Sequence, residues 1–339
     1  MAGSLPLAAT LGEPAGIGPE VLAMAWRAMK GQSRPASFYC IGDPAFLGRR
    51  FDAAGLSVPV RRIEAPGAAE ACFAEALPVL PLARSTVASG RPGAPSTADA
   101  PAVLESIETA VTNVHQGLAR AVVTSPIHKE TLYEAGFDFP GHTEYLAALT
   151  ADWTAGGCTP VMMLASDVLR VVPVTIHVPL AQVPGLLSEE LVAITGQIVA
   201  RELRERFGIA RPRLAVAGLN PHAGEGGRMG REDLEIIAPA VAKLAAADIE
   251  TVGPLSADTM FHAAARARYD VALTMYHDQA LIPIKTLSFD DAVNITLGLP
   301  LIRTSPDHGT ALPLAESGKA SAASMLAALR MADRLSRPQ

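Results

Sequence analysis

Short apolar runs alternate with polar and glycine-rich segments along the chain, and this alternation predicts an α/β fold. Strand-like apolar runs cover residues 5–11, 37–42, 119–124, 171–176, 214–219 and 270–275. Helices are predicted over residues 102–116, 188–207, 231–246 and 321–335, the first two from their amphipathic spacing. Strands that alternate with helices are typical of a parallel sheet covered by helices.

Three of the predicted strands each lead into a histidine. His177 follows the run 171–176, His222 follows the run 214–219 through an Asn-Pro pair, and His277 follows the run 270–275. Parallel strands of one sheet bring their carboxyl ends to the same edge, where ligands bind. Three imidazoles with open coordination positions are typical of a catalytic metal site. For His277 alone, the alternative is a core histidine beside a capping aspartate.

Charged residues accompany this trio. Asp278 directly follows His277, and Asp258 lies in a turn, 253–259, as a second carboxylate that can face a metal. Lys285 lies eight residues after His277, where its ammonium group can hold an anion or move a proton.

The first predicted strand runs into a glycine-rich turn and then a helix. Gly16 and Gly18 allow a tight turn and a close approach of a ligand to the backbone. The turn is not the dinucleotide fingerprint, because GxGxxG requires glycine where Val21 stands. An ordinary tight turn between a strand and a helix is the alternative.

Other polar groups are candidates for an anion site. Thr143 is predicted to cap a helix whose amides face a phosphate, and His142 can donate to the same anion. Asn294 and Arg303, with the Lys285 ammonium, would make a forked anion site. For 142–143 the alternative is a plain helix start. His128 and Lys129, after the run 119–124, are further candidates, although a surface loop is as good an interpretation.

Composition narrows the class of protein. The 339 residues suffice for two ordinary domains or one large α/β unit, and 49% hydrophobic residues predict a sizeable core. A net charge of −6 without a basic run argues against nucleic acid as a partner. No signal peptide or membrane-spanning run is recognised. Cys40, Cys72 and Cys158 are widely spaced, as in the reduced thiols of a cytoplasmic protein.

Together these motifs resemble the 4-hydroxythreonine-4-phosphate dehydrogenase family of pyridoxal phosphate biosynthesis. The matching pieces run in order from residue 12 to residue 311, and two of them, GLNPHAGEGG and RTSPDHGTA, are long and specific. They are GEPAGIGPE (12–20), SPIHK (125–129), GHTEY (141–145), the histidine after VPVTI (172–176), GLNPHAGEGG (218–227), ADT (257–259), YHDQ (276–279) with Lys285, VNITLGLP (293–300) and RTSPDHGTA (303–311).

The resemblance implies a fold like that of isocitrate and isopropylmalate dehydrogenases, with two α/β/α domains and a cleft between them. A discontinuous domain, 1–130 plus 286–339, would bind NAD, and 131–285 would bind metal and form the dimer. The active site would lie at the interface of a homodimer. The implied cofactors are NAD or NADP and one divalent metal ion per site, which is zinc, magnesium or cobalt.

Residue roles follow from the same resemblance. His177, His222 and His277 would be the metal ligands, one of them reaching across the dimer interface. Asp258, Asp278 and Lys285 would be the catalytic residues, with Lys285 either a proton carrier or a phosphate clamp. The substrate-binding residues would be His142, Thr143, Lys285, Asn294 and Arg303. The cofactor-binding residues would be Gly16, Gly18, Asp307, His308, Gly309 and Thr310.

The implied reaction oxidises 4-phosphooxy-L-threonine and then releases carbon dioxide, which gives 3-amino-2-oxopropyl phosphate. Alternatives within the family are oxidation of threonate or erythronate 4-phosphate, or of a dihydrodiol dicarboxylate. A metallohydrolase would leave the DHGTA loop without a role, and a non-catalytic binding protein fits poorly with so many polar motifs. The chain departs from the family at Ala292, where glycine is expected; alanine is unfavourable there if φ is positive.

Overall fold

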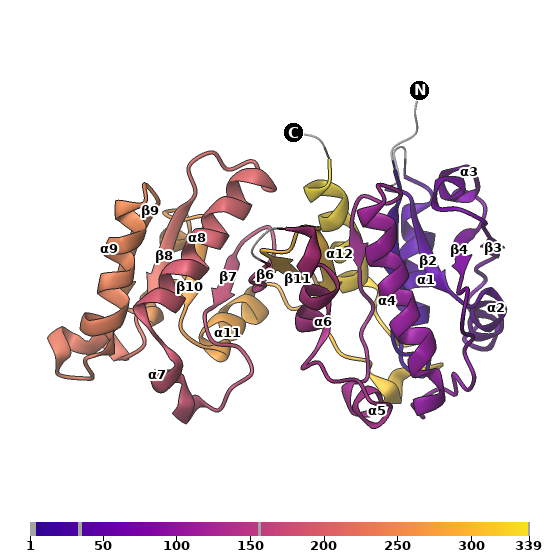
Figure 1. Ribbon diagram of the computed structural model, residues 1–339, viewed down its shortest axis with the longest axis horizontal. Coiled ribbons are helices and arrows are strands. Elements are labelled where there is room, and N and C mark those ends of the chain that lie inside the picture. The colour runs from indigo at the N-terminus through magenta and orange to yellow at the C-terminus, as the bar shows by residue number, and fades with distance from the viewer. Residues whose placement is uncertain (1–4, 33–35, 155–156, 338–339) are drawn as a thin grey trace. The chain divides into compact units, whose positions relative to one another are not determined.

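The computed structural model describes residues 5–32, 36–154 and 157–337. It divides into two compact units, which we describe separately (Figure 1). Unit 1 comprises Met1–Cys158 and Leu299–Pro338, and unit 2 comprises Thr159–Gly298. The discontinuity of unit 1 is visible in Figure 1, where the yellow C-terminal helix α12 lies among indigo and purple elements.

Unit 1 contains a parallel sheet with strand order β3-β4-β2-β1-β5-β12. Its strands are β1 Leu7–Thr10, β2 Phe38–Gly42, β3 Val60–Arg62, β4 Leu77–Pro81, β5 Val122–Val123 and β12 Arg303–Pro306. Its helices are α1 Gly18–Met29, α2 Pro44–Ala53, α3 Ala69–Cys72, α4 Ala100–His115, α5 Lys129–Glu134, α6 His142–Leu149 and α12 Ala323–Leu335. Short 3-10 helices cover η1 Pro66–Ala68, η2 Thr97–Asp99, η3 Ala151–Trp153 and η8 Leu312–Leu314.

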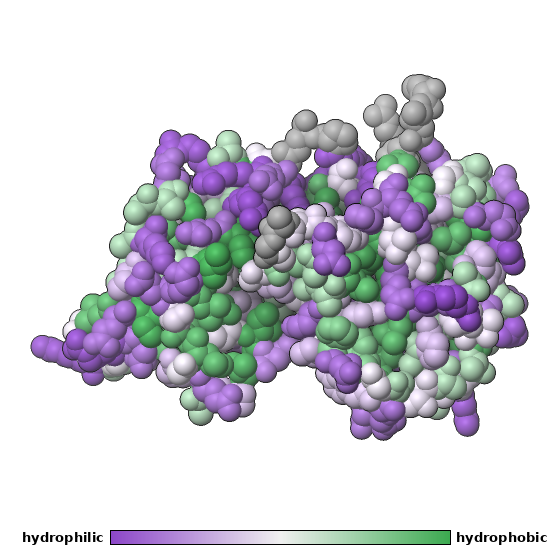
Figure 2. Space-filling view, in the orientation of Figure 1, coloured by the Kyte–Doolittle hydropathy of each residue, from purple (hydrophilic) through white to green (hydrophobic). Residues whose placement is uncertain are grey.

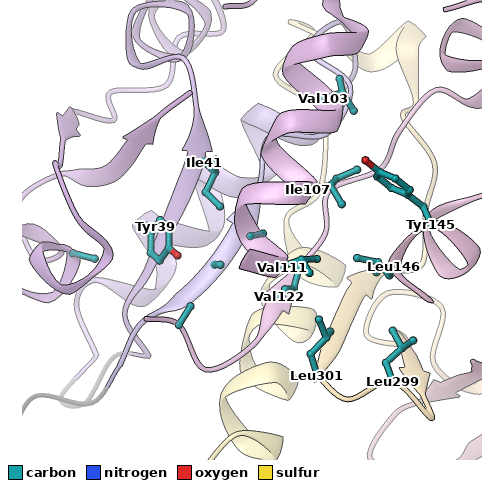
Figure 3. Packing of buried hydrophobic residues seen from close by; sticks show 14 of the residues in the cluster. Tyr39, Ile41, Val103, Ile107, Val111, Val122, Tyr145, Leu146, Leu299 and Leu301 are labelled. Carbon is teal, nitrogen blue, oxygen red and sulfur yellow. The ribbon is translucent and has the colours of Figure 1, made fainter. Parts of the chain in front are cut away.

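Helix α4 covers one face of this sheet. Its apolar stripe, which includes Val103, Ile107 and Val111, packs on the buried side chains of Tyr39 and Ile41 (Figure 3). Each such side chain contributes about 1.5–3 kcal/mol when it is fully buried. Helix α12 packs on the opposite face. Successive strand residues point to opposite faces, so the core position of Val122 leaves the next register pair, Val123 and Thr304, facing α12.

Unit 2 contains a mixed sheet with strand order β11-β6-β7-β10-β8-β9, in which β7, β10, β8 and β9 are parallel. Its strands are β6 Val161–Ala165, β7 Arg170–Pro173, β8 Arg213–Ala217, β9 Glu250–Leu255, β10 Val271–Thr274 and β11 Val293–Leu297. Its helices are α7 Val183–Leu186, α8 Glu189–Glu205, α9 Ala238–Ala246, α10 Ala263–Arg266 and α11 His277–Leu287. Shorter helical segments are η4 Leu180–Gln182, η5 Pro221–Gly227, η6 Asp233–Ile237 and η7 Ala257–Thr259.

The α/β class and the two-unit organisation agree with the sequence prediction. The predicted boundaries at 130/131 and 285/286 differ from the observed division at 158/159 and 298/299. Helix α6 belongs to unit 1, because Leu146 joins the hydrophobic cluster under α4. Strand β11 belongs to unit 2, because it pairs with β6 along its whole length.

Ala292 fits its position without backbone strain. It is 1% exposed, its N–H donates to the carbonyl oxygen of Ser288 at 3.2 Å, and it is not among the non-glycine residues with positive φ. The alanine in place of the expected glycine is therefore tolerated.

Within the described ranges, no single helix is long and apolar enough to cross a membrane. One bent pair, Leu180–Leu186 with Glu189–Glu205, meets the criterion by length and composition alone.

Candidate active site

Two of the three predicted histidines lie side by side at the carboxyl edge of the sheet in unit 2. Strands β7, β10 and β8 are parallel neighbours, as the sequence predicted, so their carboxyl ends reach one edge. After β7 and β10 the two chain segments remain paired. The N–H and hydroxyl of Thr175 both donate to the carbonyl oxygen of Met275, at 3.2 and 2.8 Å. This pairing brings the rings of His177 and His277 to a centroid distance of 5.6 Å.

Asp278 orients the ring of His277. His277 is the first residue of α11, and its Nδ1 lies 2.7 Å from Oδ1 of Asp278. A carboxylate that accepts from Nδ1 fixes the tautomer in which Nε2 carries a lone pair, which is the usual arrangement around a metal-ligating histidine. Asp278 is therefore placed to orient the imidazole through Nδ1.

Gln279 ties this histidine pair to the next strand end. Its side-chain oxygen accepts from the N–H of Met275 at 2.7 Å, and its amide nitrogen donates to the carbonyl oxygen of Gly218 at 2.8 Å. The loop that begins at Gly218 carries His222. No role was predicted for Gln279, although it belongs to the YHDQ motif.

His222 lies close enough to Asp258 for its imidazole to act on the carboxyl group. Asp258 accepts from the hydroxyl of Ser256 at 2.5 Å, and this bond, together with the nearby His222 imidazole, lowers the pKa of the Asp258 carboxyl. Within the described part of the single chain, no three His, Cys, Asp or Glu side chains form a group that can hold a metal ion. The chemistry of His177 and His277 fits two ligands of a divalent cation.

A cavity of about 280 Å³ adjoins the histidine pair. It is lined by Ile176, His177, Val178, Leu180, Val183, Tyr276, His277 and Asp278. Apolar side chains therefore border the two imidazoles.

Lys285 and Asn294 also lie in unit 2. Lys285 is in the last turn of α11, roughly 12 Å along the helix axis from His277 at 1.5 Å per residue. Its ammonium group lies 5.9 Å from the centroid of the Phe289 ring. Asn294 lies in β11 opposite Leu164 of β6 and is half-buried.

A second cluster of polar side chains lies in unit 1, around Arg303. This residue pairs in register with Val122, so its side chain points to the α4 face of the sheet. It is 4% exposed, and it donates to the hydroxyl of Thr124 from Nε at 3.0 Å and from Nη2 at 2.7 Å. Burial lowers the pKa of the guanidinium to about 10, while Glu144 opposes this shift.

His142 lies close enough to this guanidinium to sense its charge. Burial lowers the pKa of His142 well below 6.5, and the charges of Arg303 and Lys129 lower it further. Its Nε2 is buried and makes no hydrogen bond to any described residue. A Cβ at Gly141 would lie 3.3 Å from Nζ of Lys129, which places this ammonium at the start of α6. Two cationic groups and an unpartnered imidazole nitrogen suit an anionic ligand.

The predicted capping role of Thr143 is wrong. Helix α6 begins at His142, its N-cap is Gly141, and no side chain caps it. Thr143 is the second helical residue and is half-buried. With extended backbone at Gly141, the helix begins two residues earlier than a cap at Thr143 requires.

The glycine-rich turn after β1 meets the loop after β12. The N–H of Ile17 donates to the carbonyl oxygen of Thr310 at 3.0 Å. A Cβ at Gly16 would lie 2.7 Å from the same oxygen, so the close approach needs glycine. Gly18 is the first residue of α1. The loop that supplies Asp307, His308, Gly309 and Thr310 thus lies against the turn that supplies Gly16 and Gly18.

Two side chains around this turn were not predicted. Arg50 of α2 is 3% exposed, and it donates to the carbonyl oxygen of Gly16 and to the carboxylate of Glu20, each at 3.0 Å. Ser125 is 1% exposed and lies against Gly12 and Gly18, and its hydroxyl has no hydrogen-bond partner among the described residues. Ser125 belongs to the SPIHK motif, whereas no sequence signal marks Arg50.

Comparisons with known proteins show the family of the chain. The chain matches the family described as pyridoxal phosphate biosynthetic protein PdxA over residues 34–332. It is 57% identical over 330 residues to the 4-hydroxythreonine-4-phosphate dehydrogenase of Methylorubrum populi, across 97% of this chain and 94% of the relative. The solved 4-hydroxythreonine-4-phosphate dehydrogenase from Klebsiella pneumoniae is 36% identical, with a TM-score of 0.85 and 99% of each chain covered. A terephthalate 1,2-cis-dihydrodiol dehydrogenase from Burkholderia xenovorans is 27% identical, with a TM-score of 0.64 and 97% of each chain covered.

These matches define an α/β dehydrogenase. The chain belongs to the 4-hydroxythreonine-4-phosphate dehydrogenase (PdxA) family and is an oxidoreductase of pyridoxal phosphate biosynthesis. The resemblance drawn from the sequence motifs is confirmed, and the hypotheses of a metallohydrolase and of a non-catalytic binding protein are excluded.

Proposed function

We propose that the enzyme oxidises 4-phosphooxy-L-threonine with NAD or NADP and a divalent metal ion, and then releases carbon dioxide. The observation that carries this proposal is the pairing of His177 and His277 at the ends of neighbouring parallel strands, 5.6 Å apart. Two imidazoles beside a cavity lined by apolar and polar side chains can hold a metal ion that polarises a bound substrate.

In this proposal His177 and His277 hold a zinc, magnesium or cobalt ion, with Asp278 orienting His277. His222 supplies the third imidazole from the partner subunit, because the single chain does not bring it to the other two. Such an ion supplies a Lewis acid for the oxygen atom at which oxidation takes place. Asp278 orients the imidazole of His277. In the same way, Asp258 orients the imidazole of His222.

The shared site requires a homodimer, and the surface of unit 2 supports one. Leu180, Ile282 and Phe289 are 67%, 64% and 75% exposed, and Leu180 also lines the cavity at the histidine pair. Figure 2 shows apolar surface over the region where α7 and α11 lie in Figure 1. Exposed apolar groups of this size mark interaction sites.

We further propose that the enzyme is located in the cytoplasm. The free thiols of Cys40, Cys72 and Cys158 fit this reducing compartment.

The phosphate of the substrate binds to the cluster around Arg303. The guanidinium forms charge-assisted hydrogen bonds to phosphate oxygens, and Nε2 of His142 and the Lys129 ammonium add further contacts. Thr143, in the first turn of α6, offers its hydroxyl and backbone N–H to the same group. We also propose Asn294 and Lys285, which lie in unit 2, as substrate-binding residues.

The reaction balances without a further reactant. The C3–H bond breaks and its hydride passes to the nicotinamide, while the C3 hydroxyl loses its proton and becomes a ketone. The bond between C2 and the carboxylate then breaks, carbon dioxide leaves, and C2 takes up a proton. The product is 3-amino-2-oxopropyl phosphate. Lys285 either delivers the proton to C2 or holds the phosphate, and the two roles differ in their effect on turnover and on KM.

The nicotinamide cofactor binds at the joined loops of unit 1. Gly16 and Gly18 bring backbone close to the ligand, and the 307–310 loop packs against them and supplies Asp307, His308, Gly309 and Thr310.

A substrate panel tests the proposal. We expect carbon dioxide and reduced nicotinamide in equal amounts from 4-phosphooxy-L-threonine, and much less turnover with threonate or erythronate 4-phosphate or with a dihydrodiol dicarboxylate. Release of carbon dioxide without the amino ketone phosphate, or a preference for another member of the panel, would overturn the substrate assignment. It would leave the metal site untouched, because all these substrates present a hydroxyl to the same ion.

A further inference from the structure

The loop that carries His222 has an unusual backbone. Six consecutive residues, His222 to Gly227, have positive φ. Three of them have side chains, with φ of 54° at His222, 51° at Ala223 and 46° at Glu225. For residues with a Cβ, left-handed conformation costs roughly 1–2 kcal/mol each and normally occurs at single positions. Such a run persists only where the surrounding structure enforces it.

Asp233 supplies contacts that enforce this turn. Its side chain is 0% exposed, and its carboxylate accepts from the N–H of Leu219 at 2.8 Å and from the N–H of Asn220 at 3.2 Å. It also accepts from the side-chain amide of Asn220 at 2.9 Å. These bonds hold the two residues that precede Pro221 and His222 in the chain.

Two glycines of the loop pack closely against the same carboxylate. A Cβ at Gly218 would lie 2.7 Å from Oδ1 of Asp233, and a Cβ at Gly224 would lie 3.2 Å from Oδ2. The far end of the turn is closed by the N–H of Met229, which donates to the carbonyl oxygen of Gly224 at 3.1 Å. Asp233 thus contacts the turn from both sides of His222.

The element that carries Asp233 is itself irregular. Asp233 is the first residue of a π-helix, Asp233–Ile237, which continues directly into α9. One-turn π-helices are rare and occur frequently at functional sites. Here the irregular turn packs the Asp233 carboxylate against the loop, in the place where the backbone N–H groups of Leu219 and Asn220 need an acceptor.

We infer that Asp233 is a positioning residue for the metal site: it holds the left-handed turn that presents the His222 imidazole to the metal ion. This inference rests on the proposed function, in which His222 is a metal ligand. Asp233 is 0% exposed and bonds to the N–H groups of Leu219 and Asn220, so its effect on metal binding passes through the backbone of 219–222. Partners that orient a metal ligand typically change metal affinity 10–100-fold when they are removed.

Cobalt binding to the full-length enzyme, measured by calorimetry, tests the inference without relying on activity. Asp233→Asn keeps the size of the side chain but turns half of its acceptor into a donor that faces the N–H groups of the loop. We expect this variant to raise the Kd for Co²⁺ roughly 10–100-fold. A dissociation constant equal to that of the wild type would overturn the inference.

A matched control separates positioning from general loss of stability. Asp270 lies at the amino end of β10, where its carboxylate accepts from the N–H and the guanidinium of Arg213 at 2.8–3.1 Å. Asp270→Asn removes comparable bonds from the same unit at the other end of β8. We expect it to lower the melting temperature and to leave the Kd for Co²⁺ unchanged. An equal loss of Co²⁺ affinity in Asp270→Asn and Asp233→Asn would show that Asp233 only stabilises the fold and does not position His222.

Gly224→Ala is the second variant and serves if Asp233→Asn does not fold. Its new methyl group meets Asp233 and the carbonyl oxygen of Gly230 at a φ of 79°, so the turn is displaced while the carboxylate remains. Gly224→Ala should weaken Co²⁺ binding in the same way. Unchanged binding would contradict the inference that the left-handed turn positions His222. His222→Ala distinguishes failure of the proposed metal site from failure of the inference about Asp233. Unchanged Co²⁺ affinity in that variant would remove His222 from the proposed metal site, whereas a loss there together with normal binding in Asp233→Asn would overturn only the present inference.

Discussion

The imidazole rings of His177 and His277 lie 5.6 Å apart, at the carboxyl ends of the neighbouring strands β7 and β10. Asp278 holds Nδ1 of His277 at 2.7 Å, which leaves Nε2 available for a metal ion. His222, after the next strand of the same sheet, does not join them within one chain. In the proposed function the pair is one part of a metal site that a second subunit completes.

Mixing inactive variants tests whether the site is shared. If His222 comes from the partner subunit, a heterodimer of His177→Ala and His222→Ala contains one site with all three histidines. Random exchange of subunits should restore about one quarter of wild-type activity, because about half of the dimers are mixed and each has one intact site.

The control mixture is His177→Ala with His277→Ala. Both changes affect the same side of the site, so no dimer in this mixture has an intact site and no activity should return. Recovery in the control, or none in the first mixture after subunit exchange has been verified, contradicts the assignment of His222 to the partner.

Arg303 should determine affinity for the phosphate. Arg303→Lys keeps a positive charge but cannot maintain both contacts to the Thr124 hydroxyl while also binding a phosphate in a forked manner. We expect KM for the phosphorylated substrate to rise roughly tenfold or more, with a smaller change in kcat. Steady-state kinetics measure this split. Arg120→Lys, which alters another partly buried arginine of unit 1 bonded to Asp333, is the control, and its KM should stay at the wild-type value.

His142 should make the protein less stable in mild acid. Burial and the charges of Arg303 and Lys129 hold its pKa well below 6.5 in the folded state. As the pH falls through about 6.5, the unfolded chain binds a proton that the folded chain does not, so the free energy of unfolding decreases. In His142→Gln this contribution is absent, and stability should fall less between about pH 8 and pH 5. Urea unfolding at several pH values measures the difference, and parallel curves for the two proteins would contradict it.

Arg50 and Glu20 form an ion pair in which both side chains are 1% exposed. Arg50→Met leaves the Glu20 carboxylate buried without its partner, which should cost about 3–5 kcal/mol of unfolding free energy. The double variant with Glu20→Leu should regain much of that loss, because the uncompensated charge is gone. Denaturant unfolding of the single and double variants measures both effects. If the single variant is as stable as the wild type, the ion pair contributes little to the free energy of unfolding.

The same substitution should weaken cofactor binding in the proposed site. Arg50 also donates to the carbonyl oxygen of Gly16, within the turn proposed to bind NAD or NADP. Loss of this bond frees the turn, so KM for the nicotinamide cofactor should rise more than KM for the substrate. Equal changes in the two constants would indicate general destabilisation.

Local patterns in the sequence predicted much of the fold. The strands that lead to His177 and His277 are short apolar runs bounded by polar residues, and their parallel arrangement follows from the helices between them. The glycine turn after β1 was predicted for the same reason, since glycine marks a backbone that has to approach another group closely.

Relationships that depend on register and packing were not predictable. Arg303 meets His142 because β12 pairs with β5 so that Arg303 lies beside Val122, and because α6 packs on the same face. The left-handed turn at 222–227 depends on the buried Asp233 carboxylate, which comes from a separate element. Thr143 was mistaken for a helix cap because threonine is a common N-cap residue, whereas the extended Gly141 performs this role.

The most direct test of the account is metal-dependent reduction of NAD or NADP with 4-phosphooxy-L-threonine as substrate. The enzyme is stripped with a chelator, assayed by nicotinamide absorbance, and then assayed again after zinc, magnesium or cobalt is restored. We predict that the stripped wild type is inactive and regains turnover with metal, whereas His277→Ala stays inactive at every metal concentration. Full turnover in the stripped enzyme, or wild-type turnover in His277→Ala, would contradict a metal-dependent reaction at the histidine pair.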